Sequence, residues 1–517
     1  MQRAALEQRR GDLETAAAEW RTACALAPDD AYCAESLGIC EQALGDTAAA
    51  RAAYTRAVTR EPTAGRRAKL ATLVSPIIAS RDTMLAERAA MSAAMDALLE
   101  TRERLDDPID AGLWTNFYLA FHGEDDRALQ VKTAAAYRHL CPSLAYVAPH
   151  CRGAPRRGGR VRVGLISQFF QNHSIGRTSR GLFATLDRSR FEVTALFVPP
   201  VRDDEYARFI RAHAEHTVVV PPTLAAAREA IASRGLDVLF YQDIGMEPFT
   251  YFLAHARLAP VQCVSYGHPD TTGIPTLDWW ISNDRYETDE SAAHYSEGLF
   301  LLEELPTIAY YYRPERGARR RTRADFGLSD ATRCYLCPQN LFKLHPDMDD
   351  LVAAILRRDP AGRVVVVSGR VPAWDARVRE RWSRTMPDVA ERIVFVPRMN
   401  SQAYLDLIAC ADVMLDTRHF NGMNTSLEAL SVGTPVVTWP SRFQRGRHTR
   451  AMYEAMQFRE LVADDAEGYV ARAVRIANDR EYREYCRREI LARNDVLFEN
   501  LRVTRELERF LDSVTGG

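Results

Sequence analysis

Short apolar segments occur in two separate series along this 517-residue chain, and stretches with helical spacing lie between most of them. The first series comprises residues 161–167, 191–198, 217–220, 236–241 and 261–266, and the second comprises residues 334–337, 363–367, 392–396, 413–415 and 436–438. Alternation of buried strands with helices is typical of a parallel sheet covered on both faces. The sequence therefore predicts an α/β protein with two Rossmann-like domains, which would face each other across a cleft at the carboxyl ends of their strands.

A 34-residue repeat occupies the first 62 residues. Its first copy carries Gly11, Trp20, Ala23 and Pro28, and these recur as Gly45, Tyr54, Ala57 and Pro62. The period and the residue types are those of tetratricopeptide helix pairs, so we expect an all-α region before the first sheet. Only about one and a half to two repeats are visible, fewer than the roughly three usually needed for stability. The repeats must then pack on the chain that follows, or further repeats precede Met1.

Changes in composition divide the chain into four segments. Residues 1–62 hold the repeats, and residues 63–155 continue as a helical connector. A linker rich in Gly, Pro and Arg leads into the first α/β half, residues 156–318, and a basic stretch leads into the second, residues 324–517, which ends in helices. We interpret the arginines of these linkers as solvated; they are Arg156, Arg157, Arg160 and Arg162, and Arg319, Arg320, Arg321 and Arg323.

Composition excludes several classes of partner. The formal net charge is −2 and 26 % of the residues are charged, so nothing indicates binding to nucleic acid or to an anionic membrane. The longest apolar runs are too short for a membrane-spanning helix, and the charged N-terminus lacks the apolar region of a signal peptide. The ten cysteines are scattered, and the lone pair Cys334 and Cys337 is a weak metal or redox signal that fits a buried strand better. We expect a cytoplasmic protein.

The turn after the predicted strand 413–415 suggests a ligand. Asn424, Thr425 and Ser426 stand where the next helix should start, and Glu428 is expected in its first turn. Free backbone N–H groups and the positive end of the helix dipole make such a turn an anion site. A carboxylate beside it can accept a hydrogen bond from a ribose hydroxyl, so the turn is compatible with a nucleotide-sugar. A capped helix in any α/β protein would show the same pattern.

Four loops at the ends of predicted strands, residues 167–174, 267–273, 338–346 and 421–426, supply one lysine, several histidines and many small hydrogen-bond donors. In this order they resemble the cytoplasmic O-linked N-acetylglucosamine transferases and Spindly-type proteins, in a bacterial form. The resemblance runs from about residue 161 to residue 491. Its marks are Ser167 and Phe169 with His173, Ala259-Pro260-Val261-Gln262, Thr271-Thr272-Gly273 with Asp278, Leu341-Phe342-Lys343, and Asp416-Thr417 through Gly433-Thr434-Pro435.

This resemblance implies a GT-B glycosyltransferase preceded by tetratricopeptide repeats, inverting and independent of metal. It implies catalytic roles for His173, Lys343 and His268. His173 would position the acceptor hydroxyl or accept its proton, and Lys343 would stabilise the departing nucleotide diphosphate. The implied donor-binding residues are Asn340, Asn421, Gly422, Asn424, Thr425, Ser426 and Glu428, and no residue is assigned to a metal. A histidine satisfied in a loop, or a solvated lysine, is the alternative at each catalytic position.

Several positions depart from the family pattern. Met423 replaces the usual histidine and Asn424 replaces a threonine, while Glu428 stands for an aspartate and Asn340 for a glutamine. His268 lies in a Gly-His-Pro sequence that is similar to bacterial N-glucosyltransferases of adhesins, whereas many relatives have tyrosine there. These departures leave the transferred sugar open.

The motif Asp347-Met348-Asp349 formally matches a D-x-D metal site of another glycosyltransferase class. We interpret its acids as the start of a helix. The chain contains no G-x-G-x-x-G motif followed by a distal acid and no P-loop motif, so neither a nicotinamide cofactor nor P-loop chemistry is expected.

The favoured function is transfer of a sugar, first N-acetylglucosamine, from a UDP-sugar to Ser or Thr of a polypeptide acceptor, without metal or other cofactor. N-glucosylation of Asn and O-fucosylation from GDP-fucose are alternatives within the same chemistry. Two alternatives of other classes are a nucleotide-sugar epimerase and a non-catalytic tetratricopeptide scaffold. The sequence leaves the donor sugar, the acceptor, the general base and the oligomeric state open.

Overall fold

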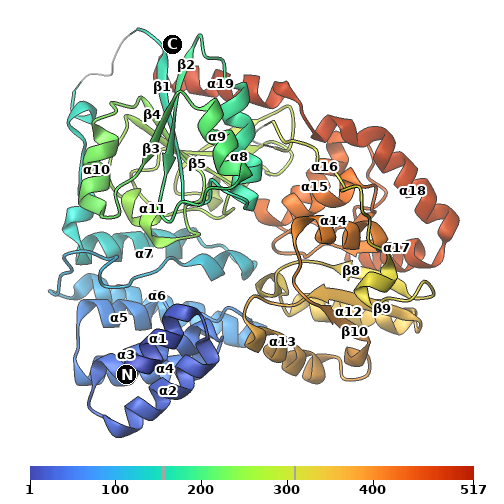
Figure 1. Ribbon diagram of the computed structural model, residues 1–517, viewed down its shortest axis with the longest axis horizontal. Helices are drawn as coiled ribbons and strands as arrows, with labels where there is room; N and C mark the ends of the chain where they lie inside the picture. Colours follow the sequence, from blue (N-terminus) through green and yellow to red (C-terminus); the bar gives the residue numbers. More distant parts are fainter. Residues whose placement is uncertain (154–157, 308–309, 517) are drawn as a thin grey trace.

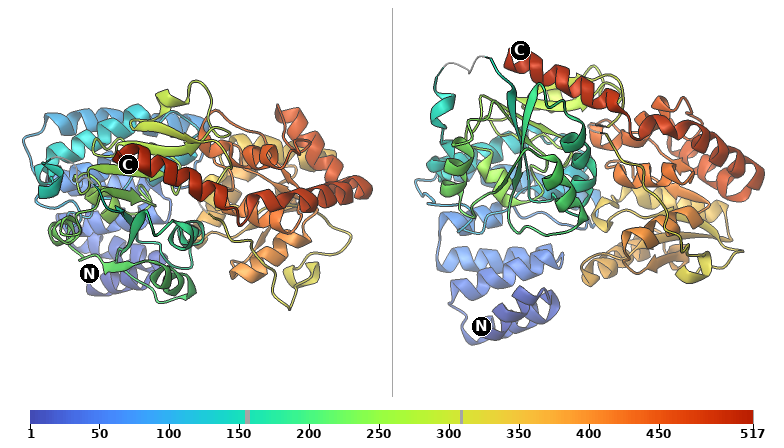
Figure 2. Two further views of the ribbon diagram at one scale, coloured as in Figure 1. Left: turned by 90° about the horizontal axis from the view of Figure 1, so that it is seen from above. Right: turned by 45° about the horizontal axis from the view of Figure 1, so that its top comes forward.

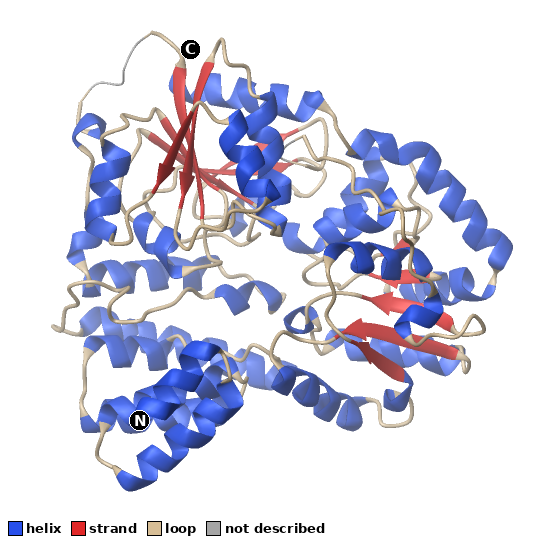
Figure 3. Cartoon of the chain, viewed as in Figure 1, coloured by secondary structure: helices blue, strands red, loops and turns tan. Residues whose placement is uncertain are grey.

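The computed structural model describes residues 1–153, 158–307 and 310–516. A helical region is followed by two α/β halves, and each half is built on its own parallel sheet (Figure 1). The strands form two separate groups, one in each half (Figure 3). This arrangement confirms the predicted fold class of two Rossmann-like domains behind an all-α region. The predicted boundary at residues 155 and 156, with Arg156 and Arg157, lies outside the described residues.

The helical region contains α1 (Gln2–Arg10), α2 (Leu13–Leu26), α3 (Ala31–Ala43), α4 (Thr47–Arg60), α5 (Ala64–Ala71), α6 (Arg81–Glu100), the short helix η1 (Phe117–Phe121) and α7 (Arg127–Leu140). The 34-residue repeat has a direct structural counterpart. The Trp20 indole donates to Gln8 Oε1 at 3.1 Å, and 34 residues later the Tyr54 hydroxyl donates to Gln42 Oε1 at 2.9 Å. Each aromatic ring is thus buried with its polar atom bonded to the preceding helix, which holds each helix pair together.

The first half contains β1 (Val161–Ser167), α8 (Ser174–Thr185), β2 (Phe191–Phe197), α9 (Glu205–His213), β3 (His216–Val219), α10 (Leu224–Ala232), β4 (Val238–Tyr241), α11 (Pro248–Leu253), β5 (Val261–Ser265), β6 (Trp279–Asn283) and β7 (Gly298–Leu302). Its sheet has the order β3-β2-β1-β4-β5-β6-β7, and all neighbours are parallel. The strand order therefore reverses between β1 and β4. Strands β6 and β7 were not predicted, because no helical pattern separates β6 from the loop that precedes it.

The second half repeats this topology. It contains β8 (Arg333–Cys337), α12 (Asp347–Arg358), β9 (Gly362–Val367), α13 (Pro372–Thr385), β10 (Ile393–Val396), α14 (Ser401–Cys410), β11 (Val413–Leu415), α15 (Asn424–Ser431), β12 (Val436–Val437), α16 (His448–Ala455), α17 (Ala466–Asn478), α18 (Arg480–Arg493) and α19 (Leu501–Thr515). The sheet order β10-β9-β8-β11-β12 reverses between β8 and β11. Both reversals are the switch points at which open α/β sheets bind ligands.

The last helix returns to the first half. Helix α19 packs against α8 and β7, far from the second sheet that precedes it in sequence (Figures 1 and 2). Glu508 accepts a hydrogen bond from the backbone N–H of Asp187 at 2.8 Å, and the ring of Phe510 lies 6.2 Å from that of Trp279. The C-terminal helices therefore do not all belong to the second half in space, and α19 ties the two halves together.

The repeats pack on the second half through α13. The Trp374 indole donates to the Ala43 carbonyl at 3.0 Å, and the Arg377 guanidinium donates to the Leu44 carbonyl at 3.1 Å. Apolar side chains of α1 to α3 belong to the same buried cluster as those of the second sheet. This contact satisfies the expectation that so few repeats need support from the chain that follows. Within the described residues, no helix has the length and apolar character needed to cross a membrane.

Candidate active site

The four polar loops of interest follow β1, β5, β8 and β11, at the carboxyl ends of the two sheets. Two of them flank the switch point between β8 and β11 in the second half. Parallel strands place the loops after β8 and β11 at the same edge, although about 78 residues separate Lys343 from Asn421 in the chain. The strand order therefore brings the predicted lysine and the predicted phosphate turn together.

Lys343 ends the short helix η6 (Leu341–Lys343) that follows β8. Its ammonium group donates to Gln339 Oε1 at 2.9 Å and to the Asn421 carbonyl at 3.1 Å, and it lies 4.5 Å from the centre of the Phe420 ring. Burial lowers the pKa of Lys343 to about 8, and the Asp416 carboxylate opposes this shift. The chain has only three lysines among its 67 basic Lys and Arg residues. A compact ammonium is thus held at the edge of the sheet, still mostly protonated near neutral pH.

The turn after β11 is fixed by the buried Asp416. One oxygen of its carboxylate accepts from the Gly422 N–H and the other from the Thr438 hydroxyl, each at 2.9 Å. A Cβ at position 422 would lie 2.4 Å from Gln339 Nε2, so glycine allows the turn to approach the loop after β8. Burial raises the pKa of Asp416 to about 6. The Asp416 carboxylate therefore holds the turn in place through these hydrogen bonds.

Helix α15 begins at Asn424, as predicted, and the N–H groups of its first residues have no acceptor within the helix. The side chain of Ser426 is buried and pairs with the Thr449 hydroxyl at 2.7 Å. Asn424 Oδ1 accepts from the Tyr311 hydroxyl at 2.7 Å, which leaves its amide N–H groups to face other acceptors. The turn therefore offers backbone and amide donors to an anion. Glu428 is the fifth residue of α15, just beyond the first turn in which it was predicted.

Glu428 pairs with Arg177 of the first half. The Arg177 guanidinium donates to Glu428 Oε1 at 2.6 Å, across the junction between α8 and α15. Burial raises the pKa of Glu428 to about 7, and Arg177 opposes that shift. The carboxylate predicted to accept from a ribose hydroxyl therefore already has a cationic partner. Asn340 is exposed, and its neighbour Gln339 is the residue that contacts Lys343.

His173 caps the N-terminus of α8. Its Nδ1 accepts the Ile175 N–H at 3.2 Å, and its ring stacks on Phe169 at 4.4 Å. Burial, with a smaller effect from Arg177, lowers the pKa of His173 to about 4, so the ring is neutral near pH 7. Because Nδ1 uses its lone pair as a helix cap, the single proton of the neutral ring belongs on Nε2. The ring then presents an N–H donor rather than a free base.

His268 lies in an aromatic cluster that joins all three parts of the chain. Its ring stacks on Phe117 of η1 at 4.8 Å and lies 6.4 Å from Phe420 of the second half. Phe121 contacts both Phe342 and Phe420, at 4.6 and 4.5 Å. Burial lowers the pKa of His268 to about 3, so the imidazole is neutral. Packing therefore accounts for its position, and its predicted catalytic role stays a prediction.

Several residues at these loops were not singled out from the sequence for the contacts that they make: Gln339, Arg177, Tyr404 and Asp416. Arg177 follows His173 by four residues, so helical spacing alone could have placed it on the same face. Tyr404 donates to the Pro338 carbonyl at 2.9 Å and lies close enough to Glu428 for that carboxylate to raise its pKa, although burial is the larger cause. No local pattern marks Tyr404, because it sits inside α14.

The two acids of the D-x-D motif have separate partners. The buried Asp349 accepts from the Arg381 guanidinium and the Trp382 indole, at 2.9 Å each. Asp347 instead bonds His419. The motif thus does not form a paired-carboxylate metal site, which fits its interpretation as a helix start.

Two surface hollows lie away from these loops. One of about 900 Å³ is lined by α4, α6 and α13, and one of about 600 Å³ is lined by α4, α5 and α6. The loops around Lys343 line neither hollow.

A family model and the similar proteins agree on one family for this chain. The model of glycosyl transferase family 41 matches residues 140–309 and 315–507. The chain is 24 % identical over 380 residues to the Arabidopsis thaliana protein named probable UDP-N-acetylglucosamine–peptide N-acetylglucosaminyltransferase SEC. That match covers 70 % of this chain and 38 % of the relative. The chain is also 25 % identical over 350 residues to the UDP-glucose:protein N-beta-glucosyltransferase of Actinobacillus pleuropneumoniae, which covers 66 % of this chain and 54 % of the relative.

A solved structure shares the fold over nearly the whole chain. It is a variant of the O-GlcNAc transferase of Thermobaculum terrenum, with a TM-score of 0.73 and 24 % identity, and the match covers 99 % of this chain and 96 % of that one. The chain spans between about a third and about half of the length of the two curated relatives. The family match covers both α/β halves, including every predicted site residue, and so the chain belongs to glycosyl transferase family 41.

Proposed function

We propose that this protein is an inverting glycosyltransferase that moves a sugar from a UDP-sugar to a polypeptide. The observation that carries the proposal is the meeting of Lys343 with the Asn421–Ser426 turn at the β8/β11 switch point, where Nζ lies 3.1 Å from the Asn421 carbonyl. A fixed ammonium and the free N–H groups of a helix start form a preorganised anion site. That site suits a diphosphate, and the names of both curated relatives specify a UDP-sugar.

In the proposed reaction the acceptor oxygen attacks the anomeric carbon from the face opposite to the diphosphate. The bond from that carbon to the diphosphate breaks as the new one forms, and the nucleotide diphosphate leaves with an added negative charge. Lys343 and the N–H groups of Asn424 to Ser426 stabilise that charge, so the bond-breaking step needs no Mg²⁺. Asn340, Asn421, Gly422 and Glu428 complete the proposed donor site.

His173 is proposed to position the acceptor rather than to take its proton. The cap bond to Ile175 occupies Nδ1, so Nε2 carries the proton and donates to an oxygen of the acceptor or donor. His268, packed on Phe117, supports the loop that faces the acceptor. The proton of the acceptor hydroxyl then passes to water, which balances the negative charge gained by the departing nucleotide diphosphate.

Transfer of N-acetylglucosamine to Ser or Thr remains the favoured form, and the Arabidopsis relative's name specifies that sugar. Glucosylation of Asn is the second candidate, since the Actinobacillus relative is named for N-glucosyl transfer and Gly267-His268-Pro269 resembles such enzymes. GDP-fucose is the third candidate donor.

The repeats and the hollow lined by α4, α6 and α13 are the proposed docking region for the polypeptide. Ten cysteines without disulfides fit a reducing compartment such as the cytosol.

A thermal-shift panel tests the proposal. UDP, GDP, UDP-N-acetylglucosamine, UDP-glucose and GDP-fucose are each added to the wild-type protein and to Lys343→Ala, with and without Mg²⁺. A ligand at a hundred times its Kd should stabilise the protein by about 2.7 kcal/mol. We expect uridine nucleotides to shift the wild type equally with and without Mg²⁺, and to shift Lys343→Ala much less. A wild type that responds to no nucleotide would instead support the non-catalytic scaffold.

A further inference from the structure

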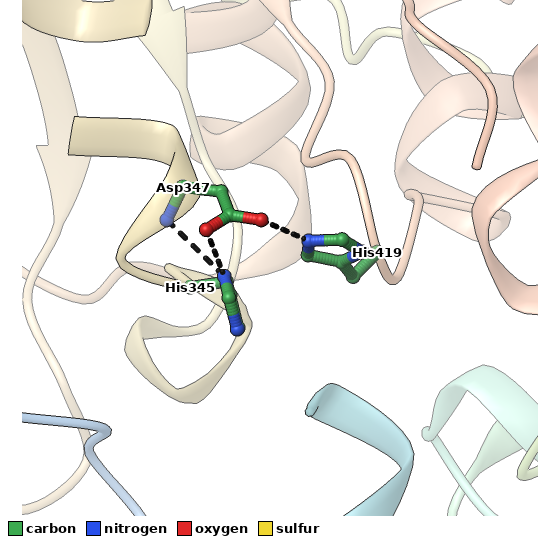
Figure 4. Close-up of side chains that lie close together, drawn as sticks. All are labelled: His345, Asp347 and His419. Carbon is green, nitrogen blue, oxygen red and sulfur yellow. Dashed lines mark hydrogen bonds and ion pairs between the residues drawn. The ribbon is translucent and has the colours of Figure 1, made fainter. Parts of the chain in front are cut away.

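Two histidines and an aspartate meet beside the donor loops (Figure 4). His345 and Asp347 flank Pro346 at the start of α12, and His419 comes from the loop after β11. His419 Nε2 lies 2.8 Å from Asp347 Oδ2, and His345 Nδ1 lies 3.4 Å from Asp347 Oδ1. All three potential ligand atoms lie within 4.8 Å of one another. None of these contacts is needed for the proposed transfer.

The spacing of these atoms suits a tetrahedral transition metal. Zinc bonds of about 2.0–2.1 Å place neighbouring ligand atoms about 3.3 Å apart in a tetrahedron. The two observed separations from the carboxylate, 2.8 and 3.4 Å, bracket that value. The third separation, between the ligand nitrogens of His345 and His419, is at most 4.8 Å, so an ion would draw the two rings, whose centres lie 4.5 Å apart, together by up to about 1.5 Å.

The ligand set also selects the kind of metal. Two imidazoles with one carboxylate suit Zn²⁺, Co²⁺ or Ni²⁺, whereas Mg²⁺ prefers an octahedral shell of oxygens. His345 is buried, and the side chains of Asp347 and His419 are 24 % and 13 % exposed. The cluster is thus shielded enough to exclude most water and open enough for an ion to enter.

Metal binding at His345 would cost little in hydrogen bonds. Its Nδ1 now accepts the Asp347 N–H at 3.1 Å. Asp347 is the first residue of α12, a position where the N–H has no partner within the helix in any case. The nearby His122 is buried with both ring nitrogens unpartnered among the described residues. Its neighbour Gly123 packs so closely on His419 that a Cβ there would lie 2.5 Å from Nδ1. Water is the proposed fourth ligand.

We infer that His345, Asp347 and His419 form a structural site for Zn²⁺ that fastens the loop after β8 to the loop after β11. The same two loops carry Lys343 and Asn421, so the ion would hold these donor-site residues in position without contacting the donor. Charge on the diphosphate is still balanced by Lys343, which is why this site and Mg²⁺-independent transfer are compatible.

Metal content measures the inference directly. Protein stripped with EDTA is dialysed against micromolar Zn²⁺, and bound zinc is counted by elemental analysis. We expect about one Zn²⁺ per wild-type chain and affinity at least about tenfold weaker in His419→Leu and His345→Asn. The matched control is His216→Leu, because His216 is an exposed histidine that also pairs with a carboxylate, Glu192, at 3.4 Å. This control should bind zinc like the wild type.

A second measurement uses only the wild-type chain, in case a variant fails to fold. Zn²⁺ should raise the Tm of the stripped protein, Mg²⁺ should not, and Co²⁺ should give the visible absorption of a tetrahedral site. A wild type that takes up no zinc, or variants that bind as much as the wild type, would overturn the inference. Nucleotide binding without zinc uptake would refute the metal site alone, whereas zinc uptake without nucleotide binding would refute the proposed function alone.

Discussion

Arg177 and Glu428 form an ion pair that joins the two α/β halves, with 2.6 Å between the guanidinium nitrogen and the carboxylate oxygen. Arg177 lies on α8, four residues after the His173 cap, and Glu428 lies on α15, two residues after the proposed phosphate turn. Both side chains are largely buried. The proposed acceptor wall and the proposed donor wall are therefore coupled directly through this ion pair.

A double-mutant cycle tests that coupling. Breaking a buried pair leaves a charge without a partner, so Arg177→Met should destabilise the protein more than the double variant with Glu428→Gln does. We expect a coupling free energy of about 1–3 kcal/mol, measured by urea unfolding. The exposed pair of Arg384 and Glu380 provides the control cycle and should couple far more weakly. Additive effects of Arg177→Met and Glu428→Gln would show that the pair does not form in solution.

Lys343→Ala should reduce turnover on the order of a hundredfold or more, because the variant loses a charge that stabilises the leaving diphosphate. Steady-state kinetics with the donor identified by the thermal-shift panel measures the effect. Lys132→Ala is the matched control, since Lys132 bonds Ser92 and Asp96 on the helical region. Unchanged turnover in folded Lys343→Ala would refute its role at the donor.

Nucleotide binding should weaken at alkaline pH. The pKa of Lys343 is lowered to about 8 by burial, so the ammonium is present below that pH and is lost above it. Affinity for UDP should therefore fall as the pH rises from about 8, approaching tenfold per pH unit. Calorimetric titration of the wild type between pH 7 and about 9.5 tests this. The fall should be absent in Lys343→Ala, and a flat wild-type profile would contradict the assignment.

Two substitutions separate the structural and chemical roles of His173. Asparagine is a good helix cap, so His173→Asn should keep the stability of α8, whereas His173→Ala should lose about 1 kcal/mol. Both variants lack the Nε2–H donor, and we expect both to lose at least about tenfold in turnover. Thermal unfolding and kinetics on the same samples give both readouts. Full activity in His173→Asn would mean that the imidazole serves only as a cap.

Local sequence patterns were sufficient for most of the fold. The strands from residue 161 to residue 265 and from residue 333 to residue 437 were predicted to within two residues at nearly every end, because each is an apolar run between polar turns. Strands β6 and β7 were not predicted because no α-helix precedes either of them, so the expected alternation of strands and helices is lost. The short β6 also begins with two adjacent tryptophans, Trp279 and Trp280, which give no strand period.

The candidate site was less predictable for a physical reason. A motif gives the position of a residue in the chain, but the partner of that residue depends on packing between distant segments. Glu428 was identified as a free carboxylate, yet its partner Arg177 lies 251 residues away. Asn340 was predicted from the family resemblance, but Gln339, two residues after the end of β8, is the residue that contacts Lys343. The cluster of His345, Asp347 and His419 was not predicted for the same reason, because its residues come from two separate loops.

Arg445 lies in the basic loop before α16, and the structure buries it. Its guanidinium bonds Asp126 at 2.8 Å and Asp270 at 3.3 Å, which links the connector, the first half and the second half. Arg445→Met should cost up to about 3–5 kcal/mol in the free energy of unfolding, because it removes the cationic partner of the buried Asp270 and leaves Asp126 with Arg88 alone. Arg442→Met is the control, since Arg442 is 60 % exposed and its partner Glu290 lies 3.9 Å away.

The reduction in the free energy of unfolding caused by Arg445→Met should also depend on pH. Burial and the neighbouring Asp126 raise the pKa of Asp270, and removal of Arg445 raises it further. A carboxyl whose pKa is raised on folding destabilises the protein above its unfolded pKa, about 3.9 for aspartate, and the penalty disappears below that pH. Because the pKa of Asp270 in the wild type is already about 8, this carboxyl ionises only above neutral pH, so the deficit of Arg445→Met should change little between about pH 5 and pH 7 and should grow as the pH rises above about 8. Urea unfolding at several pH values measures it, and a deficit that is small or independent of pH would mean that Arg445 is not the counterion of these acids.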